Sequence, residues 1–247
     1  MKKFARAFIF ALGGVAAVAA IWLMAGCGST PTSEGDSNTN ILPPNADTTG
    51  FKLDTECVRA VLDSNGYIRN LPPYQTALDL ITGVDDSTGR VTAVDFSSLS
   101  NIATLPPQIG NIPYLASLNV SYQPLLKSLP ADIGRLSHLN KLTAGHCGIR
   151  SVSPSVFNCS LLTTISFISD SLFALPNAID RLSHLSRLEL EYNQFSTLPD
   201  SIVLLNMGMQ TVNISHNCLT GLDTLKTVWV DKCTYDRNWR DLQDGCQ

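Results

Sequence analysis

The chain has 247 residues, of which 44% are hydrophobic and 15% charged, and its formal net charge is −4 at pH 7. This composition can supply a continuous apolar core, which excludes a chain that is disordered throughout. The 17 Lys and Arg residues are scattered and form no basic stripe, so we expect no nucleic-acid partner, because phosphate neutralisation needs clustered positive charge.

The N-terminal segment has the layout of an export signal. Positive residues at Lys2, Lys3 and Arg6 precede an uncharged apolar run over residues 7–25. An uncleaved membrane-spanning helix is the alternative, since this run approaches the length that crosses a bilayer. Both interpretations place the chain from Gly28 onward outside the cytoplasm, because positive residues stay on the inner side.

The segment Leu23-Met24-Ala25-Gly26-Cys27 resembles the cleavage site of bacterial lipoprotein precursors. The resemblance implies that residues 1–26 are a signal peptide and that Cys27 becomes the lipidated first residue of the mature chain. An Asp after the cysteine would favour retention at the inner membrane, and this chain has Gly28 there. The resemblance therefore implies an outer-membrane lipoprotein of the bacterial cell envelope, attached through its lipid.

Two segments separate this signal from the rest of the chain. Residues 28–50 are rich in Ser, Thr, Asn, Pro, Asp and Gly, which predicts a flexible linker. Residues 51–90 are expected to form an N-terminal cap with a short amphipathic helix. In this interpretation Asp54 caps the start of the helix, and Asn65-Gly66 ends it.

The chain from residue 91 to 225 repeats itself six times. Strand-like segments begin at Val91, Leu115, Leu139, Leu162, Leu185 and Met209, with offsets of 24, 24, 23, 23 and 24 residues. The copy that begins at Leu185 reads Leu-x-x-Leu-x-Leu-x-x-Asn-x-Phe-x-x-Leu-Pro-x-x-Ile. This pattern is similar to that of the leucine-rich-repeat family.

The repeats predict an α/β repeat fold. Each copy has one apolar face that it cannot bury alone, so neighbouring copies must stack and their strands form a parallel sheet. We therefore expect a curved solenoid with short parallel strands on its concave face, and residues 226–247 as the C-terminal cap. The asparagines Asn193 and Asn217 take inward positions where an amide can bond backbone groups of the turn, which is a structural role.

Strand positions between the core leucines are expected to face the concave side, because side chains alternate across a sheet. One column contains Ser98, Tyr122, His146, Ser169, Tyr192 and His216. The residues expected to bind a partner are Tyr122, Lys141, His146, Arg187, Glu189, Tyr192 and His216. Against this, solvent-facing strand positions hold polar residues even without a partner.

The favoured function is a non-catalytic module that binds a protein or a glycan and is tethered to the envelope. The alternative is a structural or spacer lipoprotein without a discrete ligand. The sequence has no activated nucleophile, no phosphate-binding glycine loop and no close set of metal ligands, so we expect no enzyme activity, cofactor or metal site. His146 and His216 are three repeats apart, roughly 15 Å, which is too far to share one zinc ion.

The cysteines other than Cys27 are assigned by their place in the repeats. We expect Cys147 and Cys159 to be buried core thiols, since both take inward positions. Cys233 and Cys246 follow the last repeat and could form a disulfide that seals its open end. Cys218 could compete for either of them, and the pairing is left open.

Overall fold

The computed structural model describes residues 48–67, 75–99, 101–205, 209–233 and 239–243. The predicted signal peptide, Cys27, Cys246 and most of the expected linker lie outside these residues. In the part of the chain that is described, no helix has both the length and the apolar character needed to cross a membrane.

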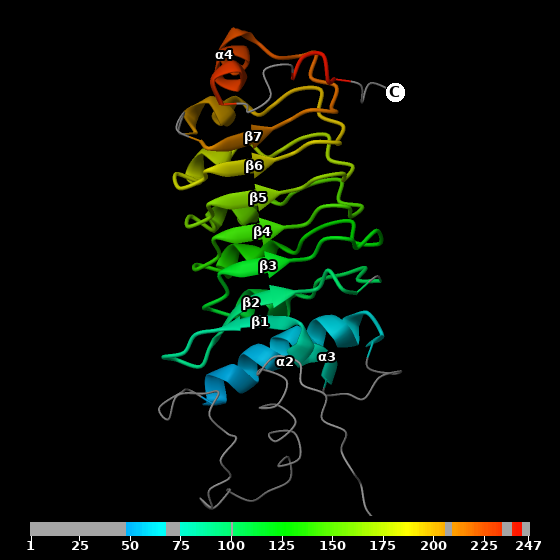
Figure 1. Cartoon of the computed structure of the whole chain (residues 1–247), viewed down its shortest axis with the longest axis vertical. Helices are drawn as coiled ribbons and strands as arrows, with labels where there is room; N and C mark the ends of the chain where they lie inside the picture. The colour runs from blue at the N-terminus through cyan, green and yellow to red at the C-terminus, as the bar shows by residue number, and fades with distance from the viewer. Residues whose placement is uncertain (1–47, 68–74, 100, 206–208, 234–238, 244–247) are drawn as a thin grey trace, which may run out of the picture.

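Seven strands form one sheet, ordered as they occur in the chain (Figure 1). They are β1 (Ile81–Val84), β2 (Val91–Asp95), β3 (Ser117–Asn119), β4 (Lys141–Thr143), β5 (Thr164–Ser166), β6 (Arg187–Glu189) and β7 (Thr211–Asn213). Strands β2 to β7 are parallel and in register, so that Lys141 lies beside Thr164 and Thr164 beside Arg187. These six parallel strands confirm the six repeats and their frame.

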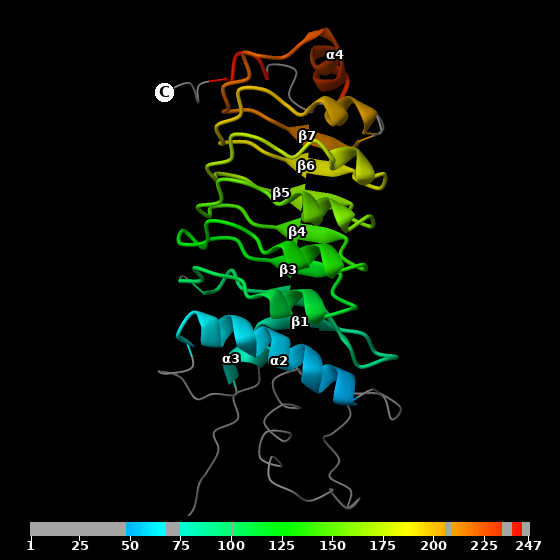
Figure 2. The same cartoon turned by 180° about the vertical axis from the view of Figure 1, so that it is seen from behind.

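Short 3-10 helices carry the chain back behind the sheet in five of the repeats (Figure 2). They are η2 (Pro107–Asn111), η3 (Ala131–Arg135), η4 (Pro154–Asn158), η5 (Ile179–Arg181) and η6 (Asp200–Leu204). The core lies between them and the sheet, where residues such as Leu188 and Ile202 are almost fully buried. Burying one such side chain stabilises the fold by about 1.5–3 kcal/mol. Each repeat that stacks on the solenoid adds the same kind of contribution.

In four of the six repeats, one inward polar side chain bonds the turn that follows the strand. The Asn193 amide donates to the carbonyls of Phe167 and Leu190 at 2.6 and 3.0 Å, and its oxygen accepts from the backbone N–H of Leu172 at 3.1 Å. Asn217 repeats this arrangement one turn later. The predicted structural role of these asparagines is therefore confirmed.

Two other repeats fill this position with a polar residue other than asparagine. Gln123 donates to the carbonyls of Phe96 and Leu99 and accepts from the backbone N–H of Ile102. Gln123 is one methylene longer than asparagine and serves a turn with one extra residue, since Leu129 comes 11 residues after Leu118 whereas Leu198 comes 10 after Leu188. Asp170 takes the same position in the fourth repeat, where its Oδ1 accepts from the backbone N–H of Cys147 at 3.0 Å.

Asp170 is the odd member of this series because a carboxylate has no proton to donate. It is buried, and its Oδ2 has no hydrogen-bond partner. Burial raises the pKa of Asp170 to about 7, against the opposing effect of hydrogen bonds from the Ile149 and Cys147 backbones. The protonated carboxyl is the form that can donate as the neighbouring amides do.

The N-terminal cap differs from the expectation at its first helix. Helix α2 spans Thr48–Ser64, followed by α3 (Gln75–Asp79), so Thr48–Gly50 belong to the helix and not to the linker. Asp54 is therefore not an N-cap. It lies inside α2, fully buried, where its carboxylate binds Nε and Nη2 of Arg90 at 2.9 and 2.7 Å and the N–H of Val91 at 3.0 Å.

The cap also contributes a strand that the repeat pattern does not contain. Strand β1 pairs with β2 in the antiparallel sense and covers the first edge of the parallel sheet, which would otherwise be open to pairing with another chain. The helix ends as predicted, since Gly66 has the left-handed φ of 76° that terminates many helices. Asn65 accepts from the backbone N–H of Ala103 at 2.7 Å and so fixes the end of α2 to the first repeat.

At the other end, helix α4 (Thr224–Cys233) covers the last repeat (Figure 1). Trp229 and Trp239 are buried there, and the Trp239 indole N–H donates to Asp231 at 3.0 Å. Gln243 accepts from the backbone N–H of Leu219 at 3.0 Å, as the inward amides do between repeats. The chain therefore closes its last repeat with one more turn of the same kind.

The predicted disulfide between Cys233 and Cys246 is wrong. Cys233 is a free, buried thiol on α4, and it packs with the apolar core of the cap. Cys218, in the last repeat's turn, is the disulfide-bonded cysteine among those described, and its partner lies outside the described residues. Cys233 is buried on α4, within the apolar core of the cap.

We predict that Asp170→Asn removes a pH dependence of stability. The folded pKa of about 7 lies above the ordinary 3.8, so the folded state keeps a proton that the unfolded state loses, and stability falls as the pH rises from about 4 to 7. The amide of the variant keeps the donor at all pH values. The variant should be more stable at pH 8 by on the order of 4 kcal/mol, and the difference should vanish near pH 4. Urea unfolding at several pH values measures this, and a difference independent of pH would contradict it.

We predict that Asp54→Ala destabilises the chain through the N-terminal cap. The substitution leaves the Arg90 guanidinium beside the core without its buried carboxylate, at a cost of about 3–5 kcal/mol in the free energy of unfolding. Asp63→Ala is the matched control, because Asp63 lies on the same helix and is exposed. Denaturant unfolding of both variants tests the prediction, which fails if the two lose equal stability.

Candidate functional site on the concave face

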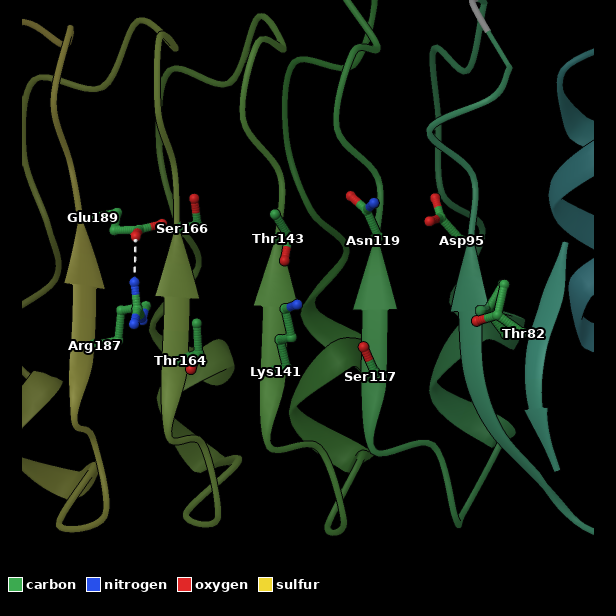
Figure 3. Close-up of a pocket in the computed structure, with 11 residues that line it drawn as sticks. Thr82, Asp95, Ser117, Asn119, Lys141, Thr143, Thr164, Ser166, Arg187 and Glu189 are labelled. Carbon is green, nitrogen blue, oxygen red and sulfur yellow. Dashed lines mark hydrogen bonds and ion pairs between the residues drawn. The ribbon is translucent and has the colours of Figure 1, made fainter. Parts of the chain in front are cut away.

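A shallow hollow of about 310 Å³ runs across the concave face from β1 to β6. Figure 3 labels the side chains that project from successive strands, which are Thr82, Asp95, Ser117, Asn119, Lys141, Thr143, Thr164, Ser166, Arg187 and Glu189. Val94 also borders the hollow, but it is buried in the core. The hollow therefore holds the predicted residues Lys141, Arg187 and Glu189, placed there by the alternation of side chains along each strand.

Charge on this face is arranged in separate groups. Lys141 is exposed in the middle of the hollow and has no ion-pair partner among the residues described. Arg187 and Glu189, both on β6, form an ion pair at 3.1 Å (Figure 3). Asp95, on β2, accepts from the backbone N–H of Ser97 at 2.8 Å. The unpaired ammonium of Lys141 thus lies between the carboxylate of Asp95 and the Arg187–Glu189 ion pair.

Most of the remaining lining carries hydroxyl groups. The side chains of Ser117, Thr143, Thr164 and Ser166 line the hollow, and within the described chain their hydroxyls take part in no internal hydrogen bond. Each hydroxyl can donate one hydrogen bond and accept two. The face therefore offers donors and acceptors that water or a partner must satisfy.

The predicted residues Tyr122, His146, Tyr192 and His216 lie elsewhere. Together with Ser169 they form a set that we call the turn column, in which every residue has a left-handed φ between 55° and 62°. They follow the strands and do not line the hollow. The expectation that they are strand residues is wrong, because the chain bends at this residue to bring the next polar side chain inward.

Backbone hydrogen bonds join the members of the turn column from one repeat to the next. The N–H of Tyr122 donates to Gly145 O at 2.8 Å, that of His146 to Ile168 O at 2.6 Å, and that of Ser169 to Glu191 O at 3.0 Å. Each acceptor immediately precedes the next member of the column. The pairing of the sheet therefore continues through the turn and keeps the column at a regular spacing.

The rings of the turn column stack in pairs. Tyr122 and His146 have ring centroids 4.9 Å apart and planes 4° apart, and Tyr192 and His216 are 4.1 Å apart at the same angle. Both tyrosines remain more than half exposed, at 59% and 53%. The regular column brings together side chains 24 residues apart and presents their ring faces beside the concave face.

A second stack lies at the opposite ends of the strands. Tyr114 and His138 have centroids 5.1 Å apart, and the Arg90 guanidinium lies 5.2 Å over the Tyr114 ring. The Nδ1 of His138 is 2.8 Å from Pro113 O. Sequence reasoning missed Tyr114, although its 24-residue distance from His138 is the same signal that the turn column gives.

Glu191, which directly precedes Tyr192 of the turn column, also has a raised pKa. Burial raises the pKa of Glu191, the nearby Glu189 raises it further, and His216 lowers it. Its Oε2 is buried without a hydrogen-bond partner. The raised pKa reflects a half-buried carboxyl that directly precedes Tyr192 of the second ring pair.

The thiols of the repeats are not placed for chemistry. Burial raises the pKa of Cys147 to about 12 and that of Cys159 to about 11, and both thiols donate to backbone carbonyls of a preceding turn. Thiols with raised pKa values are poor nucleophiles at neutral pH. The prediction of a buried core thiol is confirmed for Cys159, whereas Cys147 is only partly buried against the core. No group of three metal-binding side chains occurs in the part of the chain that is described.

The sequence was compared with models of known families and with curated proteins. No model of a known protein family matches the chain. Adenylate cyclase of Schizosaccharomyces pombe is 29% identical over 168 residues, which cover 56% of this chain and 10% of that protein. The chain spans about a tenth of the length of the curated relatives that it matches.

Solved structures match over more of the chain. The leucine-rich-repeat ectodomain of the receptor kinase SOBIR1 from Arabidopsis thaliana is 21% identical with a TM-score of 0.55, covering 70% of this chain and 95% of that one. A plant ice-binding protein is 23% identical with a TM-score of 0.53, covering 67% and 56%. Together with the six in-register repeats, these likenesses show that the chain has the fold of a leucine-rich-repeat solenoid.

Proposed function

We propose that the chain is a non-catalytic binding module that recognises a protein or glycan partner through its concave face. In this proposal the lipid on Cys27 tethers the module to the bacterial cell envelope. The observation that carries the first part is the hollow across β1 to β6, where Lys141 lies unpaired among hydroxyl groups that bond nothing within the described chain.

The chemistry of the hollow suits a polar partner with at least one acidic group. Lys141 is a flexible ammonium that a carboxylate or phosphate would pair with. The hydroxyls around it can satisfy a peptide backbone or the hydroxyls of a sugar. A rigid parallel sheet holds these groups at fixed spacing, so a partner does not have to order them on binding.

A spacer lipoprotein is the second candidate, favoured by the stacking of the exposed rings on one another. Tyr122 and Tyr192 each have a histidine partner within the chain, so their exposure alone does not require a ligand. A spacer would keep its function after any substitution by a hydrophilic residue on the concave face, whereas a binding module would lose affinity for its partner. Reversing the charge of Lys141 in the hollow therefore distinguishes a binding module from a spacer.

We predict that a partner crosslinks to the concave face and depends on Lys141. A photoactivatable residue replaces Thr164 in the hollow, and crosslinks are collected in the cells that produce the chain. Lys141→Glu should weaken the crosslinked partner's affinity at least tenfold, about 1.4 kcal/mol. Arg150→Glu is the control, since Arg150 is exposed outside the hollow and the charge change is equal. Crosslinking that both variants retain, or none at all, would favour the spacer.

We predict that Cys27→Ser prevents lipid attachment. The unaltered chain should incorporate labelled fatty acid and have the mass of a chain that starts at an acylated Cys27. The variant should take up no label and keep residues 1–26, because the thiol is the atom that carries the lipid. Intact-mass measurement of the membrane fraction decides this, and lipid retained by the variant would contradict the tether.

A further inference from the structure

The turn column contains one gap in its series of rings. Four of its five members carry a ring, and these stack as two pairs, Tyr122 with His146 and Tyr192 with His216. Ser169 lies between the pairs and has the same left-handed backbone, with φ of 56°. The position could hold a ring, since its neighbours do at the same φ, and it holds a small side chain instead.

The size of this gap follows from the backbone. The hydrogen bonds from His146 to Ile168 and from Ser169 to Glu191 keep consecutive members one strand spacing apart. His146 and Tyr192 are therefore two spacings apart, or about 10 Å. A flat ring placed midway would lie about 5 Å from each neighbour, which is close to the 4.9 and 4.1 Å seen within the existing pairs.

The surroundings of the gap suit an apolar ring with a polar edge. Ile168 precedes Ser169 and is half-buried, while the other repeats place Ser121, Gly145, Glu191 and Ser215 at its position. The Ser169 hydroxyl has no hydrogen-bond partner within the described chain. The gap thus lies between two rings and contains one hydroxyl that bonds nothing within the described chain.

We propose that this gap is a slot for one aromatic side chain of a protein partner. The ring would stack between His146 and Tyr192 and complete the column. A flat ring fits two parallel walls at this spacing, whereas a puckered sugar ring presents no flat faces to both. The inference rests on the proposed function, because it assigns part of the same partner to the edge of the concave face.

The test uses the full chain and N-acetyl-L-tyrosinamide as the probe, observed by NMR. The probe's ring protons should show saturation transfer from the protein and move upfield, because they lie between two ring faces. Ser169→Tyr should fill the slot from within and reduce binding at least tenfold. Ser169→Ala is the control, since it keeps the slot open and should bind as the unaltered chain does.

The walls give a second variant and a check on folding. Tyr192→Ala removes one wall of the slot and should also lower the affinity for the probe at least tenfold. Ser169→Tyr should be no less stable to urea than the unaltered chain, because Tyr122 and Tyr192 show that a tyrosine fits this backbone. A probe that binds Ser169→Tyr as well as Ser169→Ala, or that does not bind the unaltered chain, would overturn the slot.

The same variants separate this inference from the proposed function. If Ser169→Tyr loses the probe and also weakens the crosslinked partner, the partner inserts a ring at the slot. If Ser169→Tyr keeps the partner while Lys141→Glu loses it, the concave-face function stands and the slot is wrong. If neither variant affects any crosslink, the concave-face function fails as well, whatever the probe does.

Discussion

The backbone of each turn after a strand must find hydrogen-bond partners, and the rest of this structure depends on how it does so. The short strands leave the following carbonyl and N–H groups inside the solenoid, where an unpaired polar group is costly. Asn193 and Asn217 satisfy them with both ends of one amide. Gln123 does the same across a longer turn, and Gln243 does it beyond the last repeat.

That constraint forces the chain into a left-handed bend just before the inward side chain. Five non-glycine residues, one in each of five successive repeats, accept this conformation, which is uncommon for any single residue and here follows the repeat. The same bend sets the turn column on a regular ladder of hydrogen bonds. The alignment of the exposed rings is thus a consequence of how the turn is satisfied.

The period of the apolar residues was enough to predict the repeats, since a buried apolar residue at each equivalent position allows one register. The ends could not be predicted in this way, because they are where the period stops. The pairing of Asp54 with Arg90 joins residues 36 apart in sequence, and strand β1 replaces a missing repeat neighbour. Neither feature leaves a periodic signal in the sequence. The same is true of which cysteine, Cys218 or Cys233, forms the disulfide.

The site was predictable to the extent that strand alternation holds. It correctly placed Lys141, Arg187 and Glu189 in the hollow, and it failed at Tyr122 and its equivalents because alternation does not continue through a bend. A regular scaffold gives every repeat the same positions, so specificity must come from the repeats that depart from the pattern. Here the departures are an unpaired lysine among hydroxyls and a serine among rings. They lie one repeat apart, with the column of Thr143 and Ser166 between them.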